Sequence, residues 1–221
     1  MKELKIILKE QSFFMNIYKG GVMKVTVGIS NRHVHLTKEH LNILFGENYQ
    51  LENVKNLNQP TQFASNSFVT LKTNKGILEH VRVIGDLRNY TQVEISKTDA
   101  YMLGLNPPIR DSGDLENSEA ITLIGPKGEI SLNQGCIIAN RHIHITSKQM
   151  ELYGLQGKEE VNVLVNGPKG GMMFHVHLKV SELSYFEMHI DTDDANAFQL
   201  KQGDVVTILE GNDESQYLSK M

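Results

Sequence analysis

The sequence has one cysteine, no tryptophan, no long hydrophobic run and no surplus of basic residues. A single cysteine, Cys136, excludes an internal disulfide framework and a cysteine-rich zinc knuckle, and it fits a reducing compartment. No stretch approaches the roughly 18 apolar residues of a membrane-spanning helix, so we expect no membrane partner. Lys and Arg number 22 against 26 Asp and Glu, for a net charge of -4, which argues against nucleic acid as a partner.

The composition is that of an ordinary globular protein. The 221 residues are 40% hydrophobic and 22% charged, and this length suits one or two domains of about 100–150 residues. We expect a cytoplasmic protein. No GxGxxG or GxxxxGK[ST] sequence is present, so the usual nucleotide-binding loops are not predicted.

Residues 1–21 form a lead-in segment with apolar residues at helical spacing, ended by Gly20 and Gly21. Its longest apolar run, residues 6–8, is shorter than the roughly 7–15 residues of a secretory signal. Three interpretations stay open: an amphipathic helix packed on its own domain, a true start at Met15 or Met23, or a docking segment.

A seven-residue motif occurs twice. Residues 31–37 read Asn-Arg-His-Val-His-Leu-Thr, and residues 140–146 read Asn-Arg-His-Ile-His-Ile-Thr, with five of seven positions identical. Each copy follows a β-branched run, and each precedes a helix start, since Thr37 suits an N-cap and Thr146 with Gln149 suits a capping box. The pattern predicts strand, His-x-His and helix, twice.

A weaker repeat follows each copy. Residues 94–100 align with residues 189–195 through Ile95 with Ile190 and through two Asp-Ala pairs. In this alignment Glu94 occupies the place of His189. The first half then carries an insertion, predicted near residues 46–66.

Short strands bounded by turn residues dominate the rest of the chain. We expect strands over 67–73, 77–84, 92–96, 120–124, 161–165, 173–180 and 205–209. Helical patterns are short and lie near 38–45, 98–103 and 194–200. Many strands with few helices and no βαβ rhythm predict a mainly β fold, either a sandwich or small barrels.

His-x-His on a strand suits a metal site because side chains at i and i+2 leave the same face. Zinc takes neutral imidazoles, and catalytic zinc sites commonly have three protein ligands and an open position. Each half supplies three candidates, which are His33, His35 and Glu94 in the first half and His142, His144 and His189 in the second. Two such sites together would make a dinuclear catalytic centre, whereas strand histidines without a metal are the alternative.

A third pair, His175 and His177, lacks the Asn-Arg prefix and the helix cap. Alternation around this pair predicts an edge strand with its histidines in solvent. We interpret Cys136 as a small buried residue rather than a soft metal ligand.

Several motifs together resemble one known family. They are the two Asn-Arg-His-x-His copies, Gln-Val-Glu-Ile-Ser at 92–96, Arg-Asp-Ser-Gly-Asp at 110–114, Gly-Pro-Lys-Gly at 125–128 and 167–170, and Glu-Met-His-Ile-Asp-Thr-Asp-Asp-Ala-Asn at 187–196. Over about residues 22–210 the chain resembles the phosphate propanoyltransferases, the phosphotransacylases of the propanediol-utilisation type.

The resemblance implies an acyltransferase that converts a short-chain acyl-CoA, propanoyl-CoA or acetyl-CoA, and phosphate into acyl phosphate and CoA, reversibly. It implies two small β-barrels with short capping helices in pseudo-repeated halves, and a homodimer. Residues 22–31 plus 140–210 would form the first barrel and residues 32–139 the second.

The resemblance also implies site residues. Two Zn²⁺ per chain would be held by the two triads, the first by His33, His35 and Glu94 and the second by His142, His144 and His189. Arg88 would be catalytic and bind phosphate. Coenzyme A contacts would fall on Ile29, Ser30, Asn31, Lys75, Arg82 and Asn196.

Other interpretations remain at this point. A zinc-dependent thioester or amide hydrolase and a non-catalytic CoA-binding protein are the alternative functions, and Lys75 and Arg82 can also be ordinary solvated charges. For Arg110 the alternative is an ion pair with Asp111 or Asp114, and for Arg32 and Arg141 it is a structural role. Residues 1–20 have the form of a segment that directs some family members into a bacterial microcompartment, where shell or core proteins would be the partners. Acyl length, direction and native metal are not fixed by the sequence.

Overall fold

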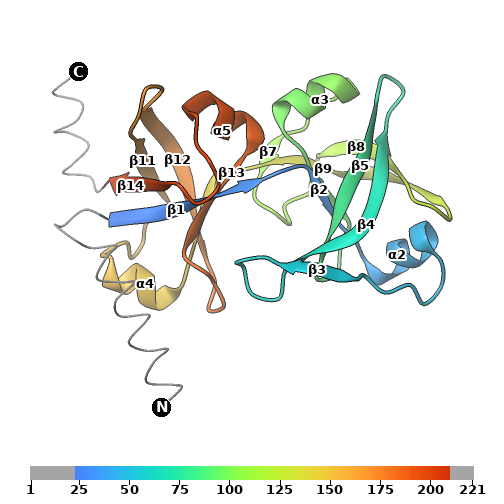
Figure 1. Ribbon diagram of the computed structural model, residues 1–221, viewed down its shortest axis with the longest axis horizontal. Helices are drawn as coiled ribbons and strands as arrows, with labels where there is room; N and C mark the ends of the chain where they lie inside the picture. The colour runs from blue at the N-terminus through green and yellow to red at the C-terminus, as the bar shows by residue number, and fades with distance from the viewer. Residues whose placement is uncertain (1–22, 210–221) are drawn as a thin grey trace, which may run out of the picture. The chain divides into compact units, whose positions relative to one another are not determined.

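The computed structural model describes residues 23–209, and the predicted lead-in segment lies outside them. The described chain divides into two compact units (Figure 1). Among the described residues, unit 1 takes 23–29, Arg141–His189 and 195–209, and unit 2 takes Ser30–Asn140 and Ile190–Asp194. Each unit is therefore assembled from segments that are distant in the sequence.

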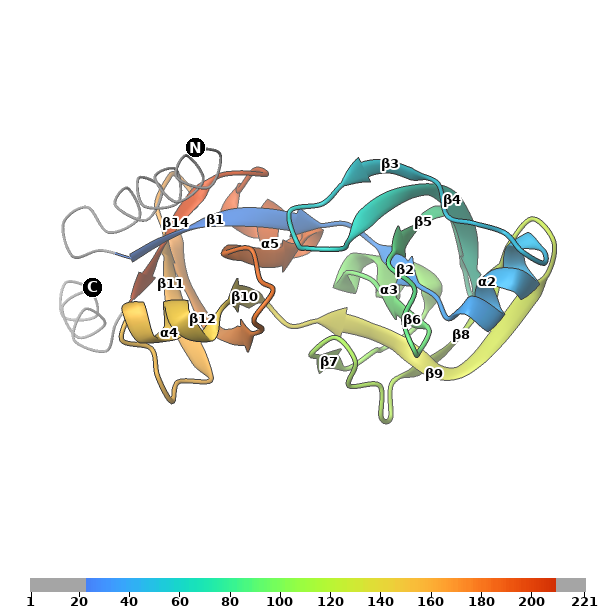
Figure 2. The ribbon, with the colours of Figure 1, turned by 90° about the horizontal axis from the view of Figure 1, so that it is seen from below.

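Unit 1 is a closed six-stranded barrel with the strand order β1-β13-β10-β12-β11-β14. Figure 2 labels β1, β10, β11, β12 and β14 of this barrel. The strands are β1 (Met23–Ser30), β10 (His142–Ile145), β11 (Glu160–Val165), β12 (Gly171–Val180), β13 (Glu187–Asp191) and β14 (Val205–Leu209). Alternate positions face inward, so Met23, Val25 and Val27 of β1 are buried whereas Lys24 is exposed. Closure leaves the ladder of this barrel without an unpaired edge.

Unit 2 also contains a closed ring of six strands, in the order β9-β6-β2-β5-β4-β8, with β8 pairing β9 to complete it. These strands are β2 (His33–His35), β4 (Phe63–Lys72), β5 (Ile77–Gly85), β6 (Gln92–Glu94), β8 (Glu119–Ile124) and β9 (Glu129–Ala139). Two further strands lie outside the ring: β3 (Asn53–Asn56) pairs with β4, and β7 (Ile109–Arg110) pairs with β9.

The two rings match strand for strand. In each ring the His-x-His strand, β10 or β2, pairs antiparallel with the strand of the third predicted ligand, β13 or β6. On its other side it pairs parallel with β12 or β5. The expectation of two small β-barrels in pseudo-repeated halves is confirmed, and equivalent positions in the two units can be compared by register.

Four short helices connect the described strands: α2 (Lys38–Phe45), α3 (Lys97–Leu103), α4 (Ser147–Leu152) and α5 (Thr192–Phe198). Thr37 caps α2, and Thr146 with Gln149 forms the predicted capping box of α4. The predicted helix 194–200 begins two residues earlier, because the Asp191 carboxylate accepts a hydrogen bond from the Asp194 amide and starts the turn there. None of the helices within residues 23–209 has the length and apolar character to cross a membrane.

The prediction of an edge strand around His175 and His177 is wrong. Strand β12 lies inside the sheet, between β10 and β11. His177 is half-buried opposite His142, and only His175 is well exposed, at a residue with φ of 56°. The alternation of apolar and polar residues in β12 does not identify an edge strand, because a central barrel strand also exposes one face to solvent.

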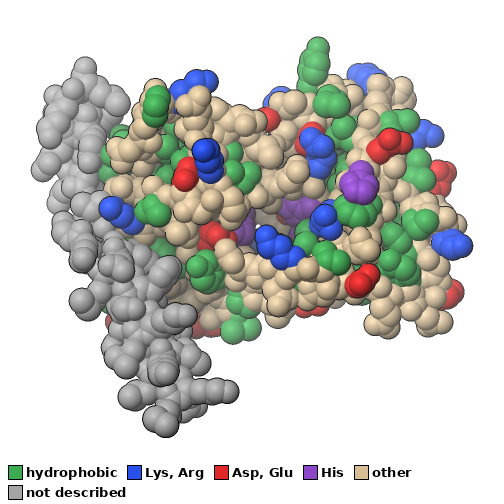
Figure 3. Space-filling view, in the orientation of Figure 1, with side chains coloured by type: hydrophobic (Ala, Val, Ile, Leu, Met, Phe, Trp, Pro, Cys, Tyr) green, Lys and Arg blue, Asp and Glu red, His purple; other side chains and the backbone are tan. Residues whose placement is uncertain are grey.

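Charges of both signs are interspersed on the face drawn in Figure 3. That face carries no extended basic patch, in keeping with the absence of a basic surplus in the sequence.

The capping box of α3 gives a test of the fold. Ser96 is buried, and its hydroxyl accepts a hydrogen bond from the Asp99 amide at 3.2 Å. We expect Ser96→Ala to lower the free energy of unfolding by about 1–2 kcal/mol in urea denaturation, because the amide loses its partner. Thr98→Ala, an exposed change in the same turn, serves as the control. Equal midpoints for the two variants would contradict the capping role.

Candidate metal centre

Each unit carries a His-x-His strand whose imidazoles leave the face opposite the core. The middle residues, Val34 and Ile143, are fully buried. Their flanking histidines share the other face because side chains alternate along a strand. The ring centroids of His33 and His35 lie 5.0 Å apart, and those of His142 and His144 lie 4.8 Å apart.

Strand pairing brings the third predicted ligand to each pair. Glu94 of β6 lies opposite His33, and His189 of β13 lies opposite His142. In each triad one potential ligand atom from each residue lies within 4.8 Å of those of the other two. The residues grouped by the sequence repeat are thus neighbours in space.

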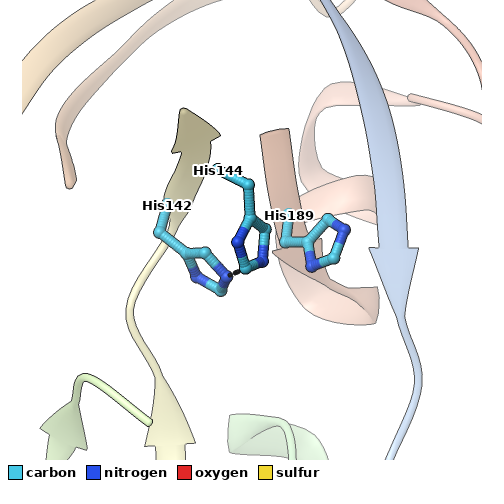
Figure 4. A group of neighbouring side chains, drawn as sticks. All are labelled: His142, His144 and His189. Atoms are coloured by element: carbon cyan, nitrogen blue, oxygen red, sulfur yellow. Dashed lines mark hydrogen bonds between the residues drawn. The ribbon is translucent and has the colours of Figure 1, made fainter. Parts of the chain in front are cut away.

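Figure 4 shows the second triad, in which one pair of ligand atoms has the separation that a tetrahedral metal requires. The Nε2 atoms of His142 and His144 lie 3.2 Å apart, and bonds of roughly 2.0–2.1 Å to zinc place tetrahedral ligands about 3.3 Å apart. Burial, reinforced by His142, His189 and Lys179, lowers the pKa of His144 to about 2. His144 is therefore neutral at physiological pH, which is the form that binds a metal.

The first triad places an imidazole nitrogen beside a carboxylate oxygen. His33 Nδ1 donates to the carbonyl oxygen of Asn31 at 2.8 Å, which leaves Nε2 as the ring nitrogen that faces Glu94. His33 Nε2 lies 3.5 Å from Glu94 Oε2, with both side chains only 12% exposed. Imidazole nitrogen and carboxylate oxygen are both ligands that zinc takes, so the donor set fits a metal ion.

Sequence reasoning missed one polar residue beside each triad. Glu187 is 4% exposed, and its Oε2 accepts a hydrogen bond from His189 Nε2 at 2.9 Å, which leaves Nδ1 of His189 for a metal. Gln92 is fully buried, and its amide nitrogen donates to Glu94 Oε1. Both residues lie two positions before the third ligand, and this same-face spacing is the signal that would have found them.

Comparison with known proteins gives the family. A sequence profile described as phosphate propanoyltransferase matches residues 26–201. The chain belongs to the phosphate propanoyltransferase family. Members of this family are acyltransferases, and this chain is one of them. The resemblance seen in the sequence motifs is therefore confirmed.

Individual members of the family are similar over most of their length. A phosphate propanoyltransferase of Thermotoga maritima is 50% identical over 187 residues, which is 84% of this chain and 89% of that protein. Those of Rhodopseudomonas palustris and Priestia megaterium are 46% and 47% identical, over 84% and 81% of this chain and 82% and 83% of theirs.

Arg88, the predicted phosphate ligand, is connected to the first triad of this acyltransferase by hydrogen bonds. Its guanidinium donates to Ser112 Oγ at 2.8 Å, and Gln92 donates to the same oxygen at 2.9 Å. Gln92 in turn holds Glu94. Arg88 also lies over the ring of Tyr90, 5.7 Å from its centroid. The motif at 110–114 thus supplies the serine that fixes the arginine.

The predicted coenzyme A contacts fall in both units. Ile29 and Asn196 belong to unit 1, and Ser30, Asn31, Lys75 and Arg82 belong to unit 2. Lys75 lies exposed in the turn between β4 and β5. Arg82 lies opposite His33, where its guanidinium donates to the Ser65 carbonyl and covers the Phe68 ring. Contact of these residues with coenzyme A remains a prediction.

Two arginines singled out in the sequence pair with carboxylates outside the triads, and Cys136 is buried. Arg32 forms an ion pair with buried Asp99 at 2.7 Å, which supports the structural interpretation of this arginine. Arg110 pairs with Asp114 at 3.4 Å. Cys136 is fully buried, and burial with nearby Glu119 raises its thiol pKa to about 12. The burial agrees with the interpretation of Cys136 as a small buried residue.

The close approach of β1 to the second triad gives a test of the site. A Cβ atom on Gly28 would lie 2.8 Å from His189 Cδ2 and 3.0 Å from Glu187 Cδ. We expect Gly28→Ala to displace His189 and to weaken zinc binding at the second triad by at least about 10-fold, measured by equilibrium dialysis. Gly171→Ala is the control, since its nearest neighbour is Phe198 Cε1 at 3.3 Å. Unchanged binding in Gly28→Ala would contradict the placement of the second site.

Proposed function

We propose that this enzyme transfers a short acyl group, propanoyl or acetyl, between coenzyme A and phosphate. A phosphate oxygen forms a bond to the thioester carbonyl carbon, and the carbon–sulfur bond breaks. The products are acyl phosphate and CoA, whose sulfur leaves as a thiolate and takes up a proton. The family relationship supports this reaction, and no nucleophilic side chain is needed because phosphate itself attacks.

We propose that the two triads each hold a zinc ion and together form a dinuclear site. Three protein ligands per ion leave positions open for substrate, as in catalytic zinc sites. Bound zinc would supply Lewis-acid stabilisation of the departing thiolate and of negative charge on oxygen. The chain's own contribution is to hold neutral imidazoles and the Glu94 carboxylate in place, in largely buried surroundings.

The hydrogen-bonded link between Arg88 and the first triad is the observation that carries the proposal. Through Ser112 and Gln92 the guanidinium is fixed in the same unit as Glu94. A planar fork of donors suits a phosphate dianion. We propose that Arg88 binds the attacking phosphate and orients it toward the thioester, which removes much of the entropic barrier.

The decisive experiment is CoA thiol release from propanoyl-CoA, with and without phosphate, alongside the zinc content of the purified chain. We expect release to require phosphate and the chain to contain about two zinc ions. Release without phosphate would indicate a thioester hydrolase instead. Absence of release from zinc-loaded protein would indicate a non-catalytic CoA-binding protein.

The role of Arg88 has a matched test. We expect Arg88→Gln to lower kcat/KM for phosphate by about 30- to 100-fold, which corresponds to the loss of ~2–3 kcal/mol of charge-assisted hydrogen bonding. Arg110→Gln should leave it within about twofold, because Arg110 is committed to Asp114. Equal losses in both variants would argue against phosphate binding by Arg88.

The homodimer, the cytoplasmic location and the route into a bacterial microcompartment through residues 1–20 remain proposals that rest on the family resemblance. Residues 1–20 lie outside the part of the chain that the structure describes.

A further inference from the structure

Gln92 and Glu187 occupy matching positions in the two barrels. Gln92 lies opposite His35 in the pairing of β2 with β6. Glu187 lies opposite His144 in the pairing of β10 with β13. Each residue thus faces the second histidine of its own His-x-His strand and precedes its third ligand by two positions. The two residues are equivalent because they hold the same place in the strand pairing of the two rings, although their side chains differ.

Both residues are buried and both bind the third ligand. Gln92 donates its amide N–H to Glu94 Oε1, and its own oxygen accepts from the Gly113 amide at 2.7 Å, which fixes the orientation of the side chain. Glu187 Oε2 accepts from His189 Nε2 at 2.9 Å. The direction of the hydrogen bond is reversed between the units, as the chemistry of the third ligand requires.

Each ligand and its buried partner together contain one carboxylate. In the first set the ligand Glu94 is a carboxylate and its partner Gln92 is neutral. In the second set the ligand His189 is an imidazole and its partner Glu187 is a carboxylate. Histidines bind a metal in their neutral form, so with a metal bound each set would carry one negative charge in total, placed on the ligand in one unit and behind the ligand in the other.

We propose that Gln92 and Glu187 are positioning residues of the two metal sites, and that Glu187 supplies from behind His189 the negative charge that Glu94 supplies by direct contact. This inference rests on the two zinc sites of the proposed function. A carboxylate on the far nitrogen of a metal-bound histidine fixes its tautomer and orientation and raises its basicity.

The surroundings of the second triad make this charge important. Lys179 of β12 lies opposite His144 and acts as a nearby cation on it. Without Glu187, a zinc ion bound by three neutral imidazoles would face that cation with no carboxylate behind His189. Glu187 therefore both orients His189 and offsets positive charge.

The first test removes the charge and keeps the shape. In full-length protein titrated with zinc against a chelating indicator, we expect Glu187→Gln to weaken one of the two sites by about 10- to 100-fold and to leave the other unchanged. Glu160→Gln is the matched control, because Glu160 also accepts from a histidine, His175, at 2.8 Å in the same unit but on exposed side chains. The control should bind both ions as the wild type does.

The second test rebuilds the pattern of unit 1 in unit 2. We expect Glu94→His alone to weaken zinc at the first triad by at least about 10-fold, since the set then carries no negative charge. Adding Gln92→Glu should restore the affinity to within a few-fold of the wild type, because a carboxylate at 92 can still accept from the Gly113 amide. A purely structural role for Gln92 predicts no such rescue.

The outcomes separate this inference from the proposed function. Wild-type protein that binds fewer than two zinc ions would overturn the metal sites and this inference with them. Two tight ions in the wild type, with Glu187→Gln unchanged or with no rescue of Glu94→His by Gln92→Glu, would overturn the inference alone. If Glu187→Gln fails to fold, the rescue in unit 2 decides, because it uses none of the residues of unit 1.

Discussion

Cross-strand register is the constraint on which the candidate site depends. Antiparallel pairing sets Glu94 opposite His33 and His189 opposite His142, and a slip by one residue would turn every one of these side chains to the other face. The register is held from the core side, where Val34 and Ile143 are fully buried. Packing of apolar side chains inside each barrel therefore determines the positions of the polar groups outside it.

Much of this site was predictable because the chain contains two copies of it. One His-x-His pair alone is weak evidence, but the second copy allowed an alignment that matched Glu94 with His189 through the neighbouring Asp-Ala pairs. The same alignment pairs Gln92 with Glu187 two positions earlier, but a neutral amide and a carboxylate share no obvious chemistry, so the pair was missed. Strand pairing and the direction of their hydrogen bonds show that the two residues are equivalent.

The fold was predictable in its class and only partly in its topology. Local signals located the short strands and the caps at Thr37 and Thr146, because turn and capping residues act within a few positions. The parallel pairs β2–β5 and β10–β12 join segments far apart in sequence, which no local pattern reveals. The placement of His177 was mispredicted for that reason, since its alternating neighbours are equally compatible with an edge strand and with a central one.

The two barrels share their backbone geometry but differ in the side chains that it positions. Strand order, register and burial are common to the two units, yet one third ligand is a carboxylate and the other an imidazole. The neighbouring cations also differ: on the strand that pairs in parallel, Arg82 lies opposite the first histidine, His33, whereas Lys179 lies opposite the second histidine, His144. The carboxylate is the metal ligand in one unit, Glu94, and the hydrogen-bond partner of the ligand in the other, Glu187. Either position can hold it because the two positions lie on one face of one strand, two residues apart. The fold fixes where charge is needed, and the sequence of each copy decides which side chain provides it.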